Sequence, residues 1–191
     1  MGSNCYSRET LETRIEVCVE RGNGSLKGST GIPFFDHMLE TLVRYARLDV
    51  SIDVEERKKV DDHHIVEDAG IALGRALDAL LGDRRGLQRF GWALIPMDDA
   101  LAYAAVDLAR RPYVVLKGLE WRRHEIGGLA LENIAHFLRT LALEARFTLH
   151  AGIVYGENEH HKAEALFKAV GWALREAMRP GGAPSTKGTL V

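Results

Sequence analysis

The chain has 191 residues, of which 46% are hydrophobic, and a formal net charge of −2. This length suits one compact domain or two fused half-domains, and the small net charge gives no reason to expect nucleic acid or an anionic membrane as a partner. No apolar run approaches the roughly 20 residues that span a bilayer, and no signal peptide is visible. We therefore expect a cytoplasmic enzyme. Cys5 and Cys18 give no support for a disulfide or a thiolate metal site.

The start of the chain predicts a β-hairpin. Apolar and polar side chains alternate over residues 13–20, which is typical of a half-buried strand. Gly22-Asn23-Gly24 predicts a hairpin turn into a second strand. Pro33 should end that strand, because proline cannot donate to a β-ladder.

Two helices with a strand between them are expected next. Asp36 is the expected N-cap of the first helix. Alternation at residues 50, 52 and 54 predicts the strand. Asp61 or Asp62 should cap the second helix, which runs to about residue 81.

The second half of the chain predicts the same order. Strands are expected near 93–97, 101–107, 112–117 and 147–155, and helices over about 129–144 and 159–178. Helices kept apart from antiparallel-type strands indicate an α+β fold, with the helices on one face of each sheet. We expect a first half over residues 1–90, a second half over 91–178 and an extended tail over 179–191.

A repeated His-His-x-x-Glu motif supports this duplication. Residues 63–77 and 160–174 share seven identities in fifteen, and residues 37–46 and 136–145 share five in ten. A repeat spacing near 97 residues indicates a duplicated half-domain rather than a short solenoid repeat. Six of the eight histidines belong to the two copies.

The repeated histidines and glutamates predict a metal site. On a helix, residues three or four positions apart lie on one face, so each glutamate is near its histidines. Adjacent histidines point about 100° apart, so they can serve two different metals. An equal division gives three histidines and one carboxylate per metal. Such a set, with no thiolate, suits Mn²⁺, Fe²⁺, Zn²⁺ or Ni²⁺, and the assignment of ligands to each metal stays open.

Some polar residues have no counterpart in the repeat. Lys168 lies one turn beyond Glu164, where the first half has Ile71, which indicates a substrate contact. The tail segment 184–188, with Ser185 and Lys187, has a composition that suits anion binding. Arg89 and Arg111 can add bidentate contacts to a phosphate.

These motifs together resemble a known family. Asp36-His37-Met38-Leu39, Asp61-Asp62-His63-His64-x-x-Glu67-Asp68, His160-His161-x-x-Glu164-Ala165-x-Phe167-Lys168 and Pro184-Ser185-Thr186-Lys187-Gly188 are similar to motifs of imidazoleglycerol-phosphate dehydratase, of histidine biosynthesis. The similarity runs from about Arg8 to Val191. Departures are Pro33 and Phe35, where the family usually has glycine and leucine, and Thr41, where it usually has glutamine.

The resemblance implies a fold, a reaction and an assembly. It implies a duplicated half-domain like domain 2 of ribosomal protein S5, two Mn²⁺ per active site, and a cubic assembly of 24 subunits with active sites between them. The implied reaction converts imidazole glycerol phosphate to imidazole acetol phosphate with loss of water. The metal ligands implied are His37, His63, His64, Glu67, His136, His160, His161 and Glu164.

The resemblance also implies roles for residues outside the metal set. Glu12 matches a glutamate near the reacting carbons, and Lys168 matches a substrate-binding lysine. Arg89, Arg111, Ser185 and Lys187 match a phosphate clamp. We expect Glu12 to act as the acid and base, with a bound water as the alternative. Two other functions compete with this one. Hydrolysis of an ester or amide, without dehydration, would indicate a different dinuclear-metal hydrolase. Binding of a phosphate ligand would distinguish the enzyme from a non-catalytic metal-binding module.

Overall fold

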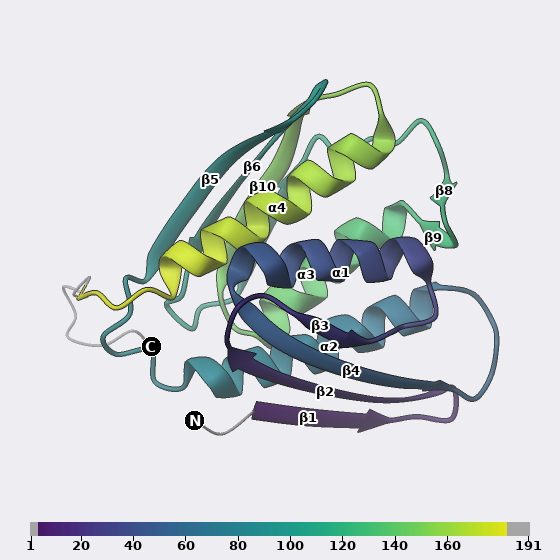
Figure 1. Ribbon diagram of the computed structural model, residues 1–191, viewed down its shortest axis with the longest axis horizontal. Helices are drawn as coiled ribbons and strands as arrows, with labels where there is room; N and C mark the ends of the chain where they lie inside the picture. Colours follow the sequence, from purple (N-terminus) through teal and green to yellow (C-terminus); the bar gives the residue numbers. More distant parts are fainter. Residues whose placement is uncertain (1–3, 183–191) are drawn as a thin grey trace.

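The computed structural model describes residues 4–182 and contains two sets of elements in the same order (Figure 1). The first set is β1 (Asn4–Glu9), β2 (Thr13–Arg21), β3 (Leu26–Gly28), α1 (Pro33–Ala46), β4 (Leu48–Glu56) and α2 (His63–Leu81). The second set is β5 (Phe90–Met97), β6 (Ala100–Asp107), β7 (Tyr113–Lys117), α3 (Glu132–Glu144), β10 (Thr148–Tyr155) and α4 (Glu159–Ala177). A small ribbon, β8 (Glu125–Ile126) with β9 (Leu129–Ala130), precedes α3.

Each set forms a four-stranded mixed sheet with the same topology. The strand orders are β1-β2-β4-β3 and β5-β6-β10-β7. The last strand in each order is parallel to its neighbour, and the other pairs are antiparallel. The α+β fold class and its duplication are therefore confirmed.

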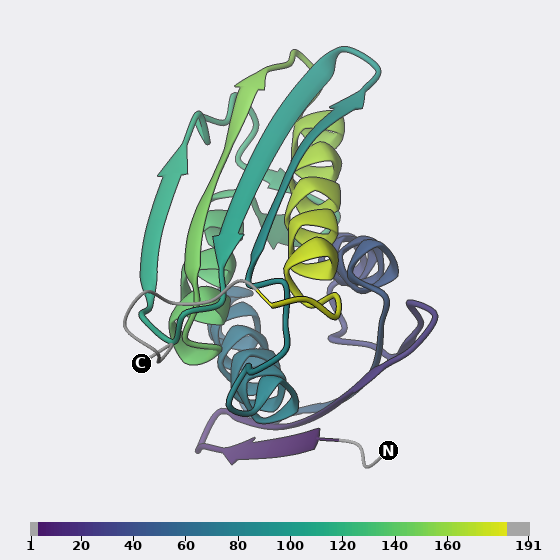
Figure 2. The ribbon, with the colours of Figure 1, turned by 90° about the vertical axis from the view of Figure 1, so that its left-hand side faces the viewer.

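The four helices lie between the two sheets (Figures 1 and 2). Helices α1 and α2 cover one face of the first sheet, and α3 and α4 cover one face of the second. Helix α1 also packs against α4, and α2 against α3. The apolar faces of both sheets and all four helices thus share one core, and each interhelical contact joins the two halves. None of the described helices has the length and apolar character needed to cross a membrane.

A repeated glycine permits the close approach of these helices. A Cβ atom added at Gly171 on α4 would lie 2.5 Å from the carbonyl oxygen of Leu42 on α1. At the matching position, Gly74 on α2, it would lie 3.0 Å from the carbonyl oxygen of Leu141 on α3. Any side chain would therefore push the two halves apart. This explains why glycine occurs at the same position of both copies.

Two local predictions were wrong. Gly22-Asn23-Gly24 does not form a hairpin between neighbouring strands, because β3 pairs in parallel with β4 and not with β2. The backbone N–H groups of Asn23 and Gly24 donate instead to Asp49 Oδ1. Helix α1 begins at Pro33, three residues before the expected N-cap Asp36, whose carboxylate accepts hydrogen bonds from the Thr30 backbone and hydroxyl.

The second helix begins as predicted, with the capping divided between two aspartates. Asp61 Oδ1 accepts a hydrogen bond from the His63 backbone N–H at 3.0 Å. Asp62 occupies the N-cap position, but its carboxylate points elsewhere and accepts hydrogen bonds from the Ala130 backbone and Asn133 side chain. The cap thus joins α2 to the β8–β9 ribbon.

The side chain of Arg84 is fully buried between the two halves. It donates to the carbonyl oxygens of Leu108, Ala145 and Arg146 and to Asp78 Oδ1, over distances of 2.5 to 3.1 Å. Burial lowers the pKa of this guanidinium, and the charge of Asp78 opposes that shift. Arg84 therefore connects the end of α2 to the end of α3 and the end of β6.

Cys5 and Cys18 form a disulfide across β1 and β2, where the two residues stand directly opposite each other. The expectation of no disulfide was wrong, because β1 was not predicted and the sequence therefore placed nothing beside Cys18. The bond ties the edge strand β1 to the rest of the first sheet.

Removing this disulfide should reduce stability without changing the fold. The bond closes a loop with a sequence separation of 13 residues. Chain entropy gives such a loop about 3 kcal/mol of stabilisation. We expect the Cys5→Ser/Cys18→Ser variant to lose up to that amount in urea unfolding followed by circular dichroism, and the wild-type protein with reductant to match it. Equal midpoints for the variant and the oxidised wild type would contradict this expectation.

Candidate metal centre

Three predicted ligands meet where α1 crosses α4; we call His37, His160 and Glu164 group A. Their donor atoms all lie within 4.8 Å of one another, and all three residues are partly buried. Glu164 Oε2 lies 3.1 Å from His160 Nε2 and 3.4 Å from His37 Nε2. One carboxylate oxygen thus faces two imidazoles from different halves of the chain.

A second, related group lies where α2 meets α3; we call His63, Glu67 and His136 group B. Its donor atoms also lie within 4.8 Å of one another. His136 Nε2 is 3.4 Å from Glu67 Oε1, and the rings of His63 and His136 stack with centroids 4.5 Å apart. Each group therefore takes a histidine and a glutamate from one half and a histidine from the other.

Hydrogen bonds outside group B orient its ligands. His63 Nδ1 lies 3.0 Å from Asn133 Oδ1, an acceptor, so Nδ1 carries the hydrogen and Nε2 keeps its lone pair. The side-chain amide of Asn133 donates to Asp62 Oδ2 at 2.9 Å. Such partners fix the tautomer and the ring orientation of a metal-binding histidine.

The two remaining histidines of the repeat point away from groups A and B. His161 Nδ1 lies 2.5 Å from Asp99 Oδ1 in the β5–β6 turn. The hydrogen bonds from His161 and from the Asn158 and Glu157 backbone hold the pKa of Asp99 well below its usual range. His64 is partly buried, and neither of its buried ring nitrogens has a hydrogen-bond partner among the described residues.

Three buried imidazole nitrogens without a hydrogen bond fit a metal. A buried polar atom that makes no hydrogen bond costs about 1–3 kcal/mol, and within the described part of the chain His64 Nδ1, His64 Nε2 and His136 Nε2 make none; each has only a carboxylate oxygen at 3.4 to 3.6 Å. Lone pairs on imidazole together with carboxylate oxygens form a donor set that suits a divalent transition metal. The residues present therefore fit the metal that the sequence predicted.

Lys168 lies beside group A, as its spacing predicted. Its Nζ atom is 2.9 Å from Glu164 Oε1, the carboxylate oxygen that faces away from the histidines. Burial raises the pKa of Glu164, but Lys168, His160 and His37 together outweigh it, so the pKa lies below its usual value. Glu164 is therefore ionised and ready to act as a ligand at neutral pH.

Glu12 lies in the turn between β1 and β2, and the structure fixes this turn through main-chain atoms. The Glu12 N–H donates to Thr10 Oγ1, and its carbonyl accepts from the N–H groups of Arg57 and Lys58. Among residues 4–182 its carboxylate has no hydrogen bond or ion pair. Glu56, which is paired with Thr13 in the sheet, lies 3.5 Å from His64. Glu12 and His64 thus occupy the same end of the first sheet.

The predicted phosphate clamp is not brought to these groups within one chain. Arg89 forms two hydrogen bonds with Asp107, which pairs with Thr148 at the start of β10. Thr148 Oγ1 donates to the Arg111 carbonyl oxygen. His160 and His161 follow the opposite end of β10, about 23 Å away at 3.3 Å per residue. Ser185 and Lys187 lie outside the described residues.

The sequence did not predict the role of the loop that contains β8 and β9. The Phe34 N–H donates to the Gly127 carbonyl oxygen, and the Phe34 ring packs against His160 of group A with centroids 5.1 Å apart. At the other end of the loop, the Ala130 N–H donates to Asp62 Oδ2, beside group B. The loop therefore joins the surroundings of both groups, and only Gly127-Gly128 marked it as a turn.

The difference from the usual family sequence at position 41 affects the helix rather than the site. Thr41, which stands where a glutamine was expected, is buried and donates to the His37 carbonyl oxygen at 2.9 Å. It therefore bonds back to α1 itself.

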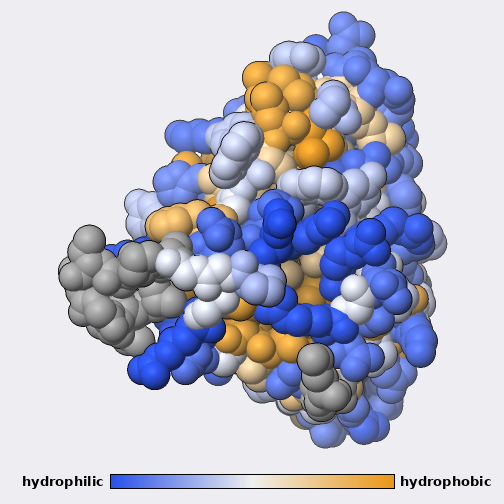
Figure 3. Space-filling view, turned by 60° about the vertical axis from the view of Figure 1, so that its left-hand side comes forward, coloured by the Kyte–Doolittle hydropathy of each residue, from blue (hydrophilic) through white to orange (hydrophobic). Residues whose placement is uncertain are grey.

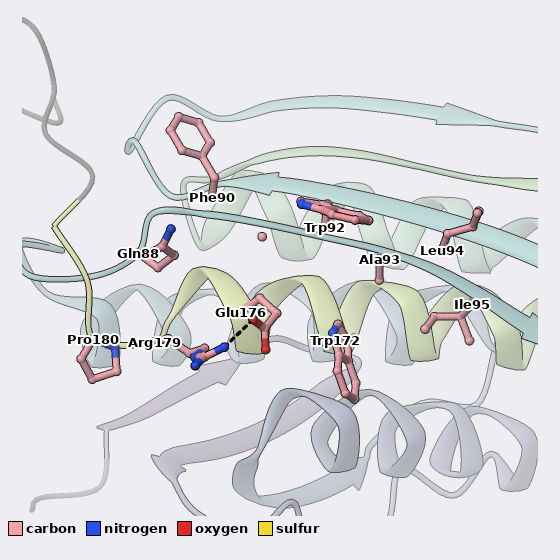
Figure 4. Close-up of a pocket in the computed structure, with 11 residues that line it drawn as sticks. Gln88, Phe90, Trp92, Ala93, Leu94, Ile95, Trp172, Glu176, Arg179 and Pro180 are labelled. Carbon is pink, nitrogen blue, oxygen red and sulfur yellow. Dashed lines mark hydrogen bonds and ion pairs between the residues drawn. The ribbon is translucent and has the colours of Figure 1, made fainter.

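A groove of about 760 Å³ lies elsewhere, between β5 and the C-terminal part of α4 (Figure 4). Trp92 and Trp172 lie on its two sides, and Arg179 pairs with Glu176 along it. None of the predicted site residues lines this groove. Its size therefore does not identify it as the reaction site.

The chain is similar to known proteins over nearly its whole length. The profile of the family described as imidazoleglycerol-phosphate dehydratase matches residues 30–174. The imidazoleglycerol-phosphate dehydratase of Pyrobaculum arsenaticum is 54% identical over 97% of this chain and 99% of its own. That of Methanopyrus kandleri is 50% identical over 96% of this chain and 94% of its own.

Two solved structures have the same fold. The imidazoleglycerol-phosphate dehydratase of Staphylococcus aureus superimposes with a TM-score of 0.82 at 30% identity, covering 93% of this chain and 99% of its own. The enzyme from Pyrococcus furiosus gives a TM-score of 0.81 at 35% identity, covering 96% of this chain and 99% of its own.

Proposed function

The chain belongs to the imidazoleglycerol-phosphate dehydratase family and is a hydro-lyase of histidine biosynthesis, and we propose that it works with two metal ions at sites shared between copies of the chain. The observation that carries this proposal is the pair of three-residue groups, A and B, each with two histidines and one glutamate. The family acts on a small phosphorylated imidazole compound, which such groups and an arginine clamp suit.

The ligand count supports a site between copies. Six of the eight predicted ligands belong to groups A and B, and His64 and His161 remain. One further histidine would give each group three imidazoles and one carboxylate. His64 and His161 project away from the groups of their own chain, so we propose that they complete groups on neighbouring copies. Mn²⁺ is the proposed ion, two per active site, because the family resemblance implies it and a donor set without thiolate suits it.

The phosphate clamp supports the same arrangement. Arg89 and Arg111 lie at the far end of the second sheet from His160, so one chain cannot place them on one small substrate. We propose that a neighbouring copy supplies them, together with its Ser185 and Lys187. Oxygen atoms of the phosphate would then accept bidentate hydrogen bonds from the guanidinium groups.

An exposed apolar surface is available for self-association. Phe90, Trp92 and Leu94 of β5 and Tyr113 of β7 are all at least half exposed. Figure 3 shows an apolar patch in its upper part, where the second sheet lies. Surfaces of this kind commonly mark protein interfaces. We propose the 24-subunit cubic assembly that the family resemblance implied, in the cytoplasm.

We propose Glu12 for the proton transfer, because it is a carboxylate outside the predicted metal set. The proton to be removed is on a carbon that is not next to a carbonyl, so the imidazole ring must accept the electron pair. Divalent ions, when bound, would act as Lewis acids that stabilise negative charge on this ring. We propose that the Glu12 carboxylate takes the proton from carbon, that the neighbouring C–O bond breaks and its hydroxyl leaves as water with the proton returned by Glu12, and that the resulting enol becomes the ketone. Lys168, held by Glu164, would contact the substrate.

Mixed assemblies test the shared site directly. Chains with His160→Ala lack a group A ligand, and chains with Arg89→Ala/Arg111→Ala lack the clamp, so each should be inactive alone. If one copy supplies the metal group and another the clamp, co-expressed chains with different affinity tags should recover about a quarter of wild-type activity. Activity and metal content are measured on assemblies purified through both tags.

The matched control is a mixed assembly of His160→Ala chains with Glu164→Gln chains. Both changes damage group A, so mixing them should restore nothing. Recovery in this control, or no recovery in the first mixture, would show that the site is not divided in this way.

A further inference from the structure

A buried polar network connects the turn that carries Glu12 to helix α2. Asp68 on α2 is 5% exposed and Thr13 is fully buried. Asp68 Oδ1 accepts a hydrogen bond from Arg8 Nε at 2.5 Å, and Asp68 Oδ2 accepts one from the Thr13 hydroxyl. Thr10 Oγ1 in turn accepts from the N–H groups of Glu12 and Thr13, at 3.1 and 3.0 Å. One carboxylate thus links the Glu12 turn to the helix that bears His63 and Glu67.

The second half makes the same contact without polar groups. In the repeat alignment, Ala165 on α4 takes the place of Asp68. Thr13 begins β2, and Ala100 begins the matching strand β6. Both alanines are buried, at 0% and 1% exposure.

The third member of the network is replaced in the same way. Arg8 on β1 stands opposite Ile15, the third residue of β2. On β5, the residue opposite the third position of β6, Ala102, is Ile95. An isoleucine therefore occupies the place of Arg8, and the arrangement of hairpin on helix does not depend on the polar network.

Stability alone gives no reason to keep this network. Replacing buried ion pairs by apolar residues of similar volume is often neutral or stabilising, and the second half shows that this fold accepts the replacement. Directional hydrogen bonds, however, fix a relative position more narrowly than apolar contacts do. The network therefore has a use in the first half that the second half lacks.

The residues that precede β2 and β6 indicate what the polar network does in the first half. Asp99 precedes Ala100 and fixes its own turn, by bonding His161 and the backbone N–H groups of Glu157 and Asn158. Glu12 precedes Thr13 in the first half. A carboxylate that transfers a proton cannot also serve as the anchor of its own turn, so this turn needs a separate one.

We propose that Asp68, with Arg8 and Thr13, is a positioning device that sets the Glu12 turn against the metal-binding face of α2. None of the three touches the reacting atoms in this proposal; they act through Glu12. The proposal rests on the function proposed above for Glu12.

The test replaces the three polar residues of the first half by the apolar residues found at the matching positions of the second half. The triple variant Arg8→Ile/Thr13→Ala/Asp68→Ala reproduces residues 95, 100 and 165. It should fold, assemble and bind metal like the wild type, with KM close to the wild-type value. Its kcat should fall by about 100-fold, the cost of a displacement of about 1 Å at a reacting group. Asp68→Asn, which keeps an acceptor for the Thr13 hydroxyl, should recover part of the loss.

A second background separates this proposal from the role of Glu12. With Glu12→Gln already present, the triple change should lower kcat little further, because the positioned group is gone. Wild-type kcat in the triple variant, or a loss of metal in proportion to activity, would overturn the positioning role. If Glu12→Gln is fully active, the function proposed for Glu12 fails, and the positioning role fails with it. If Glu12→Gln is inactive but the triple variant is fully active, the role proposed for Glu12 stands and only the positioning role of Asp68 fails.

Discussion

Glu12→Gln is expected to lower kcat by about 10²- to 10⁴-fold, the range that a positioned general acid or base contributes. Glutamine has the shape of glutamate but cannot take a proton. The bonds that hold the turn use the backbone of Glu12, so the substitution leaves them intact. Metal content should not change, because Glu12 is outside groups A and B. Steady-state kinetics with elemental analysis of the same sample measures both quantities.

Glu9→Gln is the matched control for this result. Glu9 belongs to the same hairpin, is exposed, and forms an ion pair with Arg57 at 2.7 Å. Exposed pairs of this kind contribute little, so kcat should stay near the wild-type value. Retained activity in Glu12→Gln would remove Glu12 from proton transfer, and a loss of metal would make it a ligand instead.

Arg84→Met should cause a large loss of stability. Each buried polar group left without a partner costs about 1–3 kcal/mol, and here three carbonyl oxygens lose their donor, whereas Asp78 keeps its ion pair with Arg146. Methionine keeps the stem of the side chain, so the loss reports the hydrogen bonds. Urea unfolding followed by circular dichroism gives the change in midpoint at constant slope.

The neighbouring residue provides the comparison. The side chain of Arg85 is 88% exposed and, within residues 4–182, forms an ion pair only with Asp83, at 3.6 Å. Arg85→Met should therefore leave the midpoint almost unchanged. Similar midpoints for the two variants would show that Arg84 does not hold the halves together.

Periodic segments of the sequence predicted most of the fold. The alternation in β2, β6 and β10 and the helical spacing in α2 and α4 are set by burial on one face, so each can be read locally. The parallel pair β3–β4 could not, because it depends on where β3 lies after folding. Gly22-Asn23-Gly24 has the sequence of a hairpin turn, yet Asp49, 26 residues after Asn23, decides its conformation.

The candidate site shows the same division. The repeat predicted the six residues of groups A and B, since ligand chemistry and spacing are local properties, but it did not separate them from His64 and His161, which lie outside both groups. It could not pair His37 with Glu164, because that pairing follows from the crossing of α1 and α4. Asp68 belonged to a motif of the sequence, but its hydrogen bonds with Arg8 and Thr13 could not be predicted, because they follow from the packing of β1 and β2 against α2.

Neither half of the chain contains a whole group. A free-standing first half would carry His37 alone for one group and His63 with Glu67 for the other, and a free-standing second half would carry the complement. Two copies of one such half, packed as the halves are here, would assemble both. On the metal-binding role proposed for groups A and B, a half-length ancestor would have completed either group only as a dimer, and joining the two halves in one chain makes that encounter intramolecular and independent of protein concentration.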